Sequence, residues 1–355
     1  MNFAYSPFAQ RILFGNGCLS NLRNELQRLK RMRAVVLSTP HQAALAHSLL
    51  LSLEDLGAGV FSDAKMHVPV ETVHRAQDYL HARQADAIVA YGGGSTIGLA
   101  KALALRAGGK LSIIAIPTTY AGSEMTTIYG ITENSLKTTG RDLSVLPSTV
   151  LYDPNLTLDL PLDISLFSGV NAIAHAAEAL YAHDRSPISD LLAQEGIRAL
   201  VQGMPALRLD SQDPISRSHC LYGAWLCGTV LGQVTMGLHH KLCHTLGGTL
   251  DLPHAETHTI LLPHSLAYNY RAVPQAMQRI EAAMGTRHAA TGLYEFISKL
   301  GLPTSLRDIG MQEKDIALVC DVVMAHPYSN PREVERDSIM RLLRRAWDGS
   351  VPIDT

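Results

Sequence analysis

The chain has 355 residues, of which 46% are hydrophobic and 17% charged, so it can bury a sizeable core and is not a disordered protein. Its net charge of −2 argues against a nucleic-acid-binding protein, which usually carries a basic face. No apolar run is long enough for a membrane span, no export signal is evident, and the five cysteines include no Cys-x-x-Cys pair. We therefore expect a cytoplasmic enzyme with no membrane or nucleic-acid partner.

The first half of the chain alternates short apolar runs with helix-like segments. Residues 34–38, 87–90, 112–116 and 149–152 are apolar runs typical of strands buried on both faces of a parallel sheet. Segments 70–83 and 98–107 have helical periodicity. Because parallel strands need crossover connections, this alternation predicts β-α-β units.

After Leu162 the strand-like runs end and helical patterns take over. We predict an α/β dinucleotide-binding domain over 1–158 and an all-helical substrate and catalytic domain over 159–355. Pro154 and Pro161 interrupt any regular element near the join. The clearest helices are predicted at 171–181, 187–202, 217–232 and 275–284.

Two loops at the ends of predicted strands favour a nucleotide site. Gly92-Gly93-Gly94-Ser95 leads from strand 87–90 into a helix, whose free amides and dipole can bind a phosphate. A plain tight turn is the alternative, because the G-x-G-x-x-G pattern is not present. Thr118, Thr119 and Ser123 follow strand 112–116, where α/β sheets bind ligands, although hydroxyl side chains also cap helices.

Histidines gather in the second half of the chain. His240 and His244 lie four residues apart, as do Asn171 and His175, and such pairs share one helix face and can hold a metal. The alternative is that these histidines cap, hydrogen-bond or lie at the surface. We favour that alternative for His258 and His264, but not for the set His175, His240, His244 and His254.

The chain resembles the iron-containing (group III) alcohol dehydrogenases over nearly its whole length. The resemblance rests on GGGS at 92–95, IPTTYAGSE at 116–124, NAIAHAAEAL at 171–180 and HHKLCHTLGG…PHA at 239–255. It implies a Rossmann-like N-terminal domain and a helical C-terminal domain, an architecture shared with dehydroquinate synthase. It also implies that the nicotinamide cofactor is bound by Ser38, Thr39, Gly93, Gly94, Ser95, Thr118, Thr119, Ser123 and Lys137.

The resemblance locates the family's metal ligands at Asn171, His175, His240 and His254. Asn171 stands where most members carry an aspartate, so the site has lost its anionic ligand and is interpreted as vestigial, with no metal required. Ala255 likewise replaces the usual glycine. Near Thr39 many members place an acidic residue against the adenine ribose, and this chain lacks it. NADPH would therefore be less repelled, so we expect NADH as cofactor with NADPH also possible.

In the segment at 116–124 and in Asn171, the chain resembles those family members that reduce maleylacetate. This unsaturated keto diacid is reduced to 3-oxoadipate in the degradation of aromatic compounds. Hydride addition to its activated carbon–carbon double bond forms an enolate. Hydrogen bonds can stabilise this enolate, and an acid must then protonate its carbon. We predict that the catalytic histidines are His175, His240, His244 and His254, and that Asn171, Tyr120 and Lys241 bind the dicarboxylate.

Three other functions remain open from the sequence. A metal-dependent alcohol or polyol dehydrogenase would use the same fold, and an NAD-dependent cyclase or lyase of the dehydroquinate synthase type has a similar architecture. A non-catalytic metal-binding protein would have no use for the glycine loop. Members of the family are often dimers, so we also expect a homodimer.

Overall fold

The computed structural model describes residues 3–134, 136–325 and 328–354. These residues form two compact units, one spanning 7–160 and the other 161–354 together with 3–6. The sequence-based division at 158/159 had assigned residues 3–6 to the first domain. The predicted fold class, a Rossmann-like α/β unit followed by a helical unit, is confirmed.

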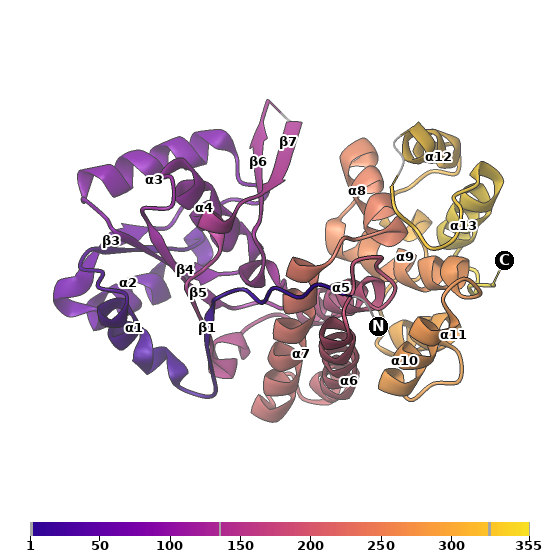
Figure 1. The fold of residues 1–355 in the computed structure, drawn as a ribbon, viewed down its shortest axis with the longest axis horizontal. Helices are drawn as coiled ribbons and strands as arrows, with labels where there is room; N and C mark the ends of the chain where they lie inside the picture. Colours follow the sequence, from indigo (N-terminus) through magenta and orange to yellow (C-terminus); the bar gives the residue numbers. More distant parts are fainter. Residues whose placement is uncertain (1–2, 135, 326–327, 355) are drawn as a thin grey trace. The chain divides into compact units, whose positions relative to one another are not determined.

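The α/β unit is built on a parallel sheet with six strands among the described residues (Figure 1). All four predicted strands are present and form its centre. The two outermost strands were not predicted. In order across the sheet the strands are β1 (Arg11–Phe14), β8 (Thr149–Tyr152), β5 (Ser112–Pro117), β4 (Ala87–Gly92), β2 (Ala34–Leu37) and β3 (Gly57–Phe61).

Helices cover both faces of this sheet, which explains its continuous apolar strands. In β2, Ala34 and Val36 point to one face, while Val35 and Leu37 point to the other, because successive side chains alternate. The first face packs against α1 and α2 and the second against α3 and α4 (Figure 1). These helices are α1 (Leu22–Arg28), α2 (Ala43–Ser52), α3 (Val70–Ala82) and α4 (Gly94–Arg106).

A two-stranded antiparallel hairpin, β6 (Ile128–Glu133) and β7 (Leu136–Arg141), follows β5 in the chain. It was not predicted, because its strands are polar and half-exposed rather than apolar. Within the α/β unit, strand β6 of this hairpin packs against α4 and α3.

The helical unit contains α5 to α13. Helix α5 packs against α6, α7 and α9, and α8 packs against α9. Helices α6 and α7 approach so closely that a Cβ on Gly223 would lie 2.8 Å from the carbonyl oxygen of Gly196. None of the described helices has the length and apolarity needed to cross a membrane. The helices are α5 (Leu162–Ala179), α6 (Pro187–Leu209), α7 (Pro214–Gln233), α8 (Leu238–Leu250), α9 (His254–Asn269), α10 (Pro274–Met284), α11 (Ala289–Lys299), α12 (Asp315–Ala325) and α13 (Arg336–Asp348).

Candidate active site

The loop between β4 and α4 forms a cradle of backbone amides. Gly92 has φ +148°, and a Cβ there would lie 2.5 Å from Thr96 Oγ1, so only glycine fits. Gly93 is the N-cap of α4 and brings no side chain to the first amides of the helix, while Gly94 is exposed with open space around it. The amides of Gly94 and Ser95 at this helix N-terminus suit a pyrophosphate.

Gln42 connects this loop to the neighbouring strand ends. Its Nε2 donates to Thr118 Oγ1 at 3.0 Å, and Thr39 Oγ1 donates to its Oε1 at 3.4 Å. The amide of Thr118 donates to the carbonyl of Gly92 at 3.2 Å. Two predicted cofactor-binding residues, Thr39 and Thr118, are therefore connected by a glutamine that sequence reasoning missed. Its only signal was its place just after a buried strand.

Lys101 fixes the loop that contains Ser123. Its Nζ is buried and donates to the carbonyl oxygens of Ser123, Thr126 and Ile128 at 2.6, 2.7 and 2.8 Å. Burial lowers the pKa of Lys101 to about 7, against the opposing effect of the Glu124 carboxylate. The sequence signal that was overlooked is a single lysine inside an apolar helix. Of the other predicted cofactor residues, Ser38 is buried and the side chain of Lys137 lies outside the described residues.

The four predicted catalytic histidines lie together in the helical unit. The rings of His175 and His240 stack with centroids 5.2 Å apart, and the ring of His244 lies 6.1 Å from that of His240. His244 and His254 are themselves stacked at 6.2 Å. His175 and His240 are buried, whereas His244 and His254 are exposed. The side chains come from α5, α8 and α9, with His254 at the first residue of α9.

Glu178 is hydrogen-bonded to one histidine of this cluster and was not predicted from the sequence. It is buried, and His240 Nδ1 donates to its Oε2 at 2.6 Å. The amides of Gly237 and His239 at the start of α8 also donate to it, at 3.0 and 2.8 Å. The carboxylate therefore orients His240 and leaves Nε2 as its reactive nitrogen. Glu178 lies three residues after His175 on α5, a spacing that puts the two on one helix face.

Several polar atoms at this site have no hydrogen-bond partner within the described parts of the chain. They are His240 Nε2, His175 Nδ1 and Asn171 Oδ1, all of them buried. Buried polar atoms are seldom left unpaired, so their grouping marks a place that a ligand would satisfy. Burial, and then the neighbouring His240, His254 and His244, lowers the pKa of His175 well below its ordinary value.

The other residues predicted to bind substrate do not all join this group. Lys241 follows His240 on α8 and is half-buried, and Tyr120 is buried in the α/β unit. His258, expected to be a capping, hydrogen-bonded or surface residue, is buried and hydrogen-bonded to His239, with its ring 4.3 Å from that of His254. His264 is buried as well, and burial lowers its pKa to about 4.

The residues at the family's metal position do not fit a tightly held divalent cation. Asn171 offers a neutral amide where an anionic oxygen would offset the charge of the ion. Across the described residues, one trio of histidine, cysteine or acidic side chains has all its ligand atoms within 4.8 Å of one another, namely His239, Cys243 and His258. None of the histidines predicted from the family's ligand pattern belongs to this trio.

Comparison with known proteins identifies the class of protein to which this fold and site belong. Residues 9–154 match the iron-containing alcohol dehydrogenase family, and residues 165–347 match the C-terminal region of the Fe-containing alcohol dehydrogenase family. The chain belongs to the iron-containing alcohol dehydrogenase family and is an NAD(P)H-dependent oxidoreductase.

Within that family the chain is similar to maleylacetate reductases. It is 53% identical to the maleylacetate reductase of Rhizobium sp. strain MTP-10005 over 99% of both chains, and 52% identical to that of Burkholderia cepacia over the same share. The crystal structure of the Rhizobium enzyme superimposes with a TM-score of 0.96 over 99% of both chains. That of the Agrobacterium tumefaciens maleylacetate reductase, 50% identical, gives 0.97 over 99% of this chain and all of the other.

Proposed function

We propose that this enzyme reduces the carbon–carbon double bond of maleylacetate to give 3-oxoadipate, without a metal ion, with NADH or NADPH as reductant. The substrate assignment draws on the full-length similarity to maleylacetate reductases. The observation that carries the chemistry is the Glu178–His240 hydrogen bond, which leaves a buried Nε2 with no hydrogen-bond partner among the described residues, on a ring stacked with that of His175.

The reaction adds one hydride and one proton to the double bond. The reduced nicotinamide supplies the hydride when it is bound at the cradle formed by Gly93, Gly94 and Ser95. Hydride addition to the carbon β to the ketone moves the π electrons toward the carbonyl oxygen, which becomes an enolate oxygen. Protonation of the α carbon, which lies between the β carbon and the carbonyl carbon, restores the ketone and completes the reduction. The conjugated ketone makes the double bond electron-poor, so hydrogen bonds can take the place of a Lewis acid.

His240 is suited to stabilise the enolate. When protonated, its Nε2–H can donate to the developing oxyanion, while the carboxylate of Glu178 on Nδ1 stabilises the imidazolium charge. Asn171 then acts as a neutral hydrogen-bonding group, which does not repel a substrate carboxylate as aspartate would. His175 stays neutral and adds a hydrogen-bonding nitrogen. The exposed His244 is our candidate for the proton donor, with His254 stacked beside it.

The decisive experiment is a spectrophotometric assay of NADH and NADPH oxidation with maleylacetate, before and after exhaustive dialysis against a chelator. We expect undiminished activity after dialysis. Activity that vanishes and returns with Fe²⁺ or Zn²⁺ would instead indicate a metal-dependent dehydrogenase. His244→Ala should lower kcat far more than it raises KM for NADH, and wild-type turnover in that variant would reject its role as acid.

A homodimer, and binding of the dicarboxylate substrate by Tyr120 and Lys241, are further parts of this proposal. Light scattering coupled to size exclusion measures the first. For the second, the ratio of activity toward maleylacetate and toward uncharged unsaturated ketones should fall when Lys241 is replaced by methionine.

A further inference from the structure

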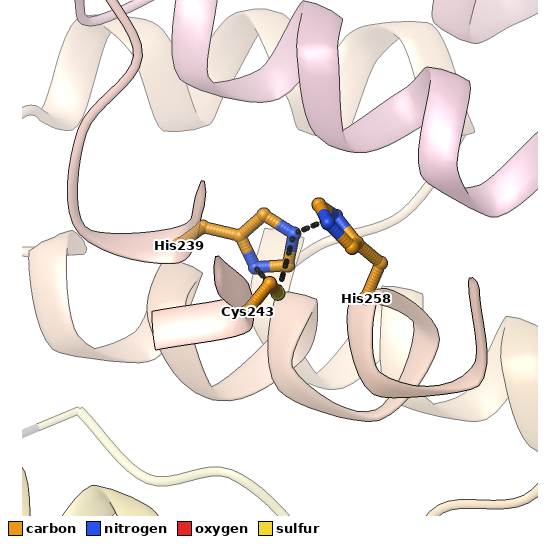
Figure 2. Close-up of side chains that lie close together, drawn as sticks. All are labelled: His239, Cys243 and His258. Carbon is orange, nitrogen blue, oxygen red and sulfur yellow. Dashed lines mark hydrogen bonds between the residues drawn. The ribbon is translucent and has the colours of Figure 1, made fainter. Parts of the chain in front are cut away.

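Three side chains that the proposed reaction does not use meet in the interior of the helical unit. His239 and Cys243 lie four residues apart on α8, and His258 comes from α9 (Figure 2). All three are buried, and one ligand atom from each lies within 4.8 Å of the other two. This trio combines two imidazoles and a thiol, the side chains that bind soft and borderline cations.

The distances within the trio are close to those of a zinc site. Cys243 Sγ lies 3.6 Å from His239 Nε2, and His239 Nε2 lies 2.9 Å from His258 Nδ1. With bonds of about 2.3 Å to sulfur and about 2.05 Å to nitrogen, a tetrahedral Zn²⁺ holds its S and N ligands about 3.6 Å apart and two N ligands about 3.4 Å apart. The sulfur–nitrogen distance is near this value, but Cys243 Sγ also lies 3.9 Å from His239 Nδ1, beside the ring. The thiol must therefore turn toward the Nε2 lone pair, and the two rings must separate by about 0.5 Å to exchange their hydrogen bond for an ion.

We propose that His239, Cys243 and His258 form a binding site for Zn²⁺, distinct from the family's metal position at Asn171, His175, His240 and His254. The three ligand atoms are Cys243 Sγ, His239 Nε2 and His258 Nδ1, and a water molecule completes the tetrahedron. Binding forms a zinc–sulfur bond and releases the thiol proton to solvent. No electrons are transferred. This inference does not depend on which substrate the enzyme reduces.

The electrostatic surroundings suit such an ion. Glu178 lies close enough to Cys243 to raise its pKa further beyond the effect of burial. Its carboxylate and the Cys243 thiolate together balance the two positive charges of zinc.

The second nitrogen of each ring, the one that would not bind zinc, is in surroundings compatible with this site. Ser265 Oγ lies 3.5 Å from His239 Nδ1, where it can orient that ring as outer-shell partners of metal ligands do. His258 Nε2 is buried and has no hydrogen-bond partner among the described residues. A ring whose second nitrogen is unpartnered can tilt toward an ion without breaking another bond.

Zinc at this position would join α8 to α9. These helices also carry His240, His244 and His254, but the ion would bind none of these three rings, so turnover should not require it. The bound state should be more stable than the metal-free state, because an ion that binds only the folded chain stabilises it by mass action.

The test is zinc binding by the full-length protein, first stripped with chelator and then passed through a desalting column after incubation with Zn²⁺. We expect one Zn²⁺ per chain by elemental analysis and a higher unfolding temperature than in the stripped protein. Cys243→Ser should weaken binding on the order of 100-fold or more and abolish the thermal shift. Cys227→Ser, which alters an equally buried thiol on α7, is the matched control and should bind like wild type.

His175→Ala separates the two possible positions, because it removes a ligand of the family's site and leaves the trio intact. Retention of zinc in this variant, with loss in Cys243→Ser, supports the proposal. The reverse pattern, or no zinc retained by wild type, overturns it. If Cys243→Ser does not fold, Co²⁺ added to the wild-type protein decides. A thiolate-to-cobalt charge-transfer band supports the site, and a cobalt spectrum without one refutes it.

Discussion

Replacing Glu178 with glutamine tests how far His240 depends on the carboxylate behind it. Glu178 accepts three hydrogen bonds: from Gly237 and His240 on Oε2 and from His239 on Oε1. An amide that keeps its oxygen at Oε2 presents NH₂ to the amide of His239, where two donors then face each other. One buried backbone hydrogen bond is lost, so the free energy of unfolding should fall by about 1–3 kcal/mol.

The effect on catalysis should be larger than this loss of stability. The bond to His240 changes from charge-assisted to neutral, which roughly halves its strength, and the negative charge that stabilises the imidazolium disappears. If the transition state loses about 3–4 kcal/mol of stabilisation, kcat for maleylacetate falls on the order of 10²–10³-fold. KM for NADH should stay the same, because the predicted cofactor loops belong to the α/β unit.

Glu25→Gln supplies the matched control for this experiment. Glu25 is also a buried carboxylate with several partners, since it accepts from Arg11 and Arg28 at 2.9 and 2.8 Å. We expect Glu25→Gln to lower stability but to leave kcat within about threefold of wild type. Steady-state kinetics with unfolding curves for both variants make the comparison. A Glu178→Gln enzyme that turns over like the control would refute the role given to His240.

Three further predictions concern the cofactor, the substrate site and acid stability. Thr39→Asp should raise KM for NADPH relative to NADH by about tenfold or more, because a carboxylate beside the ribose repels a 2′-phosphate; equal KM values would contradict this. Asn171→Asp should lower kcat/KM for maleylacetate by about tenfold while strengthening binding of divalent cations, as kinetics and equilibrium dialysis measure. The folded-state pKa of His264 is about 4 and its ordinary value is 6.5, so folding favours the neutral form. About 3 kcal/mol of folding stability that is present above pH 6.5 is therefore lost as the pH falls to about 4. His264→Asn should show a shallower loss in urea unfolding over this range, and identical slopes would exclude His264 as the cause.

The fold was predictable where burial leaves a clear pattern. Strands β2, β4, β5 and β8 are covered on both faces, so their residues are apolar without interruption and visible in the sequence. The edge strands β1 and β3 are half-exposed, with sequences such as Gly57–Phe61 that resemble loops. Their positions depend on pairing with neighbours distant in the chain, which one sequence does not reveal.

The candidate site was predictable for residues with a distinctive side chain or spacing, and not for those that support them. The histidines stand out by their four-residue spacing, and the structure brings them together. Gln42, Lys101 and Glu178 are ordinary polar residues whose roles arise from hydrogen bonds to residues distant in the chain. Each contacts another segment of its own unit, so its importance follows from tertiary contacts.

Two positions on α5 together determine what His240 can do. A carboxylate at the Asn171 position, one helical turn before His175, would add negative charge to the histidine cluster and favour a cation there, whereas the carboxylate of Glu178 acts on Nδ1 of His240. When the carboxylate of Glu178 at Nδ1 is the negative charge that acts on the ring, His240 can carry a proton on Nε2 and donate it in a hydrogen bond to an oxyanion. In the proposed reaction His240 therefore acts as a hydrogen-bond donor, at a position where the family resemblance implies a metal ligand. A substrate whose double bond is already polarised can use this weaker electrophile, and an unactivated alcohol cannot.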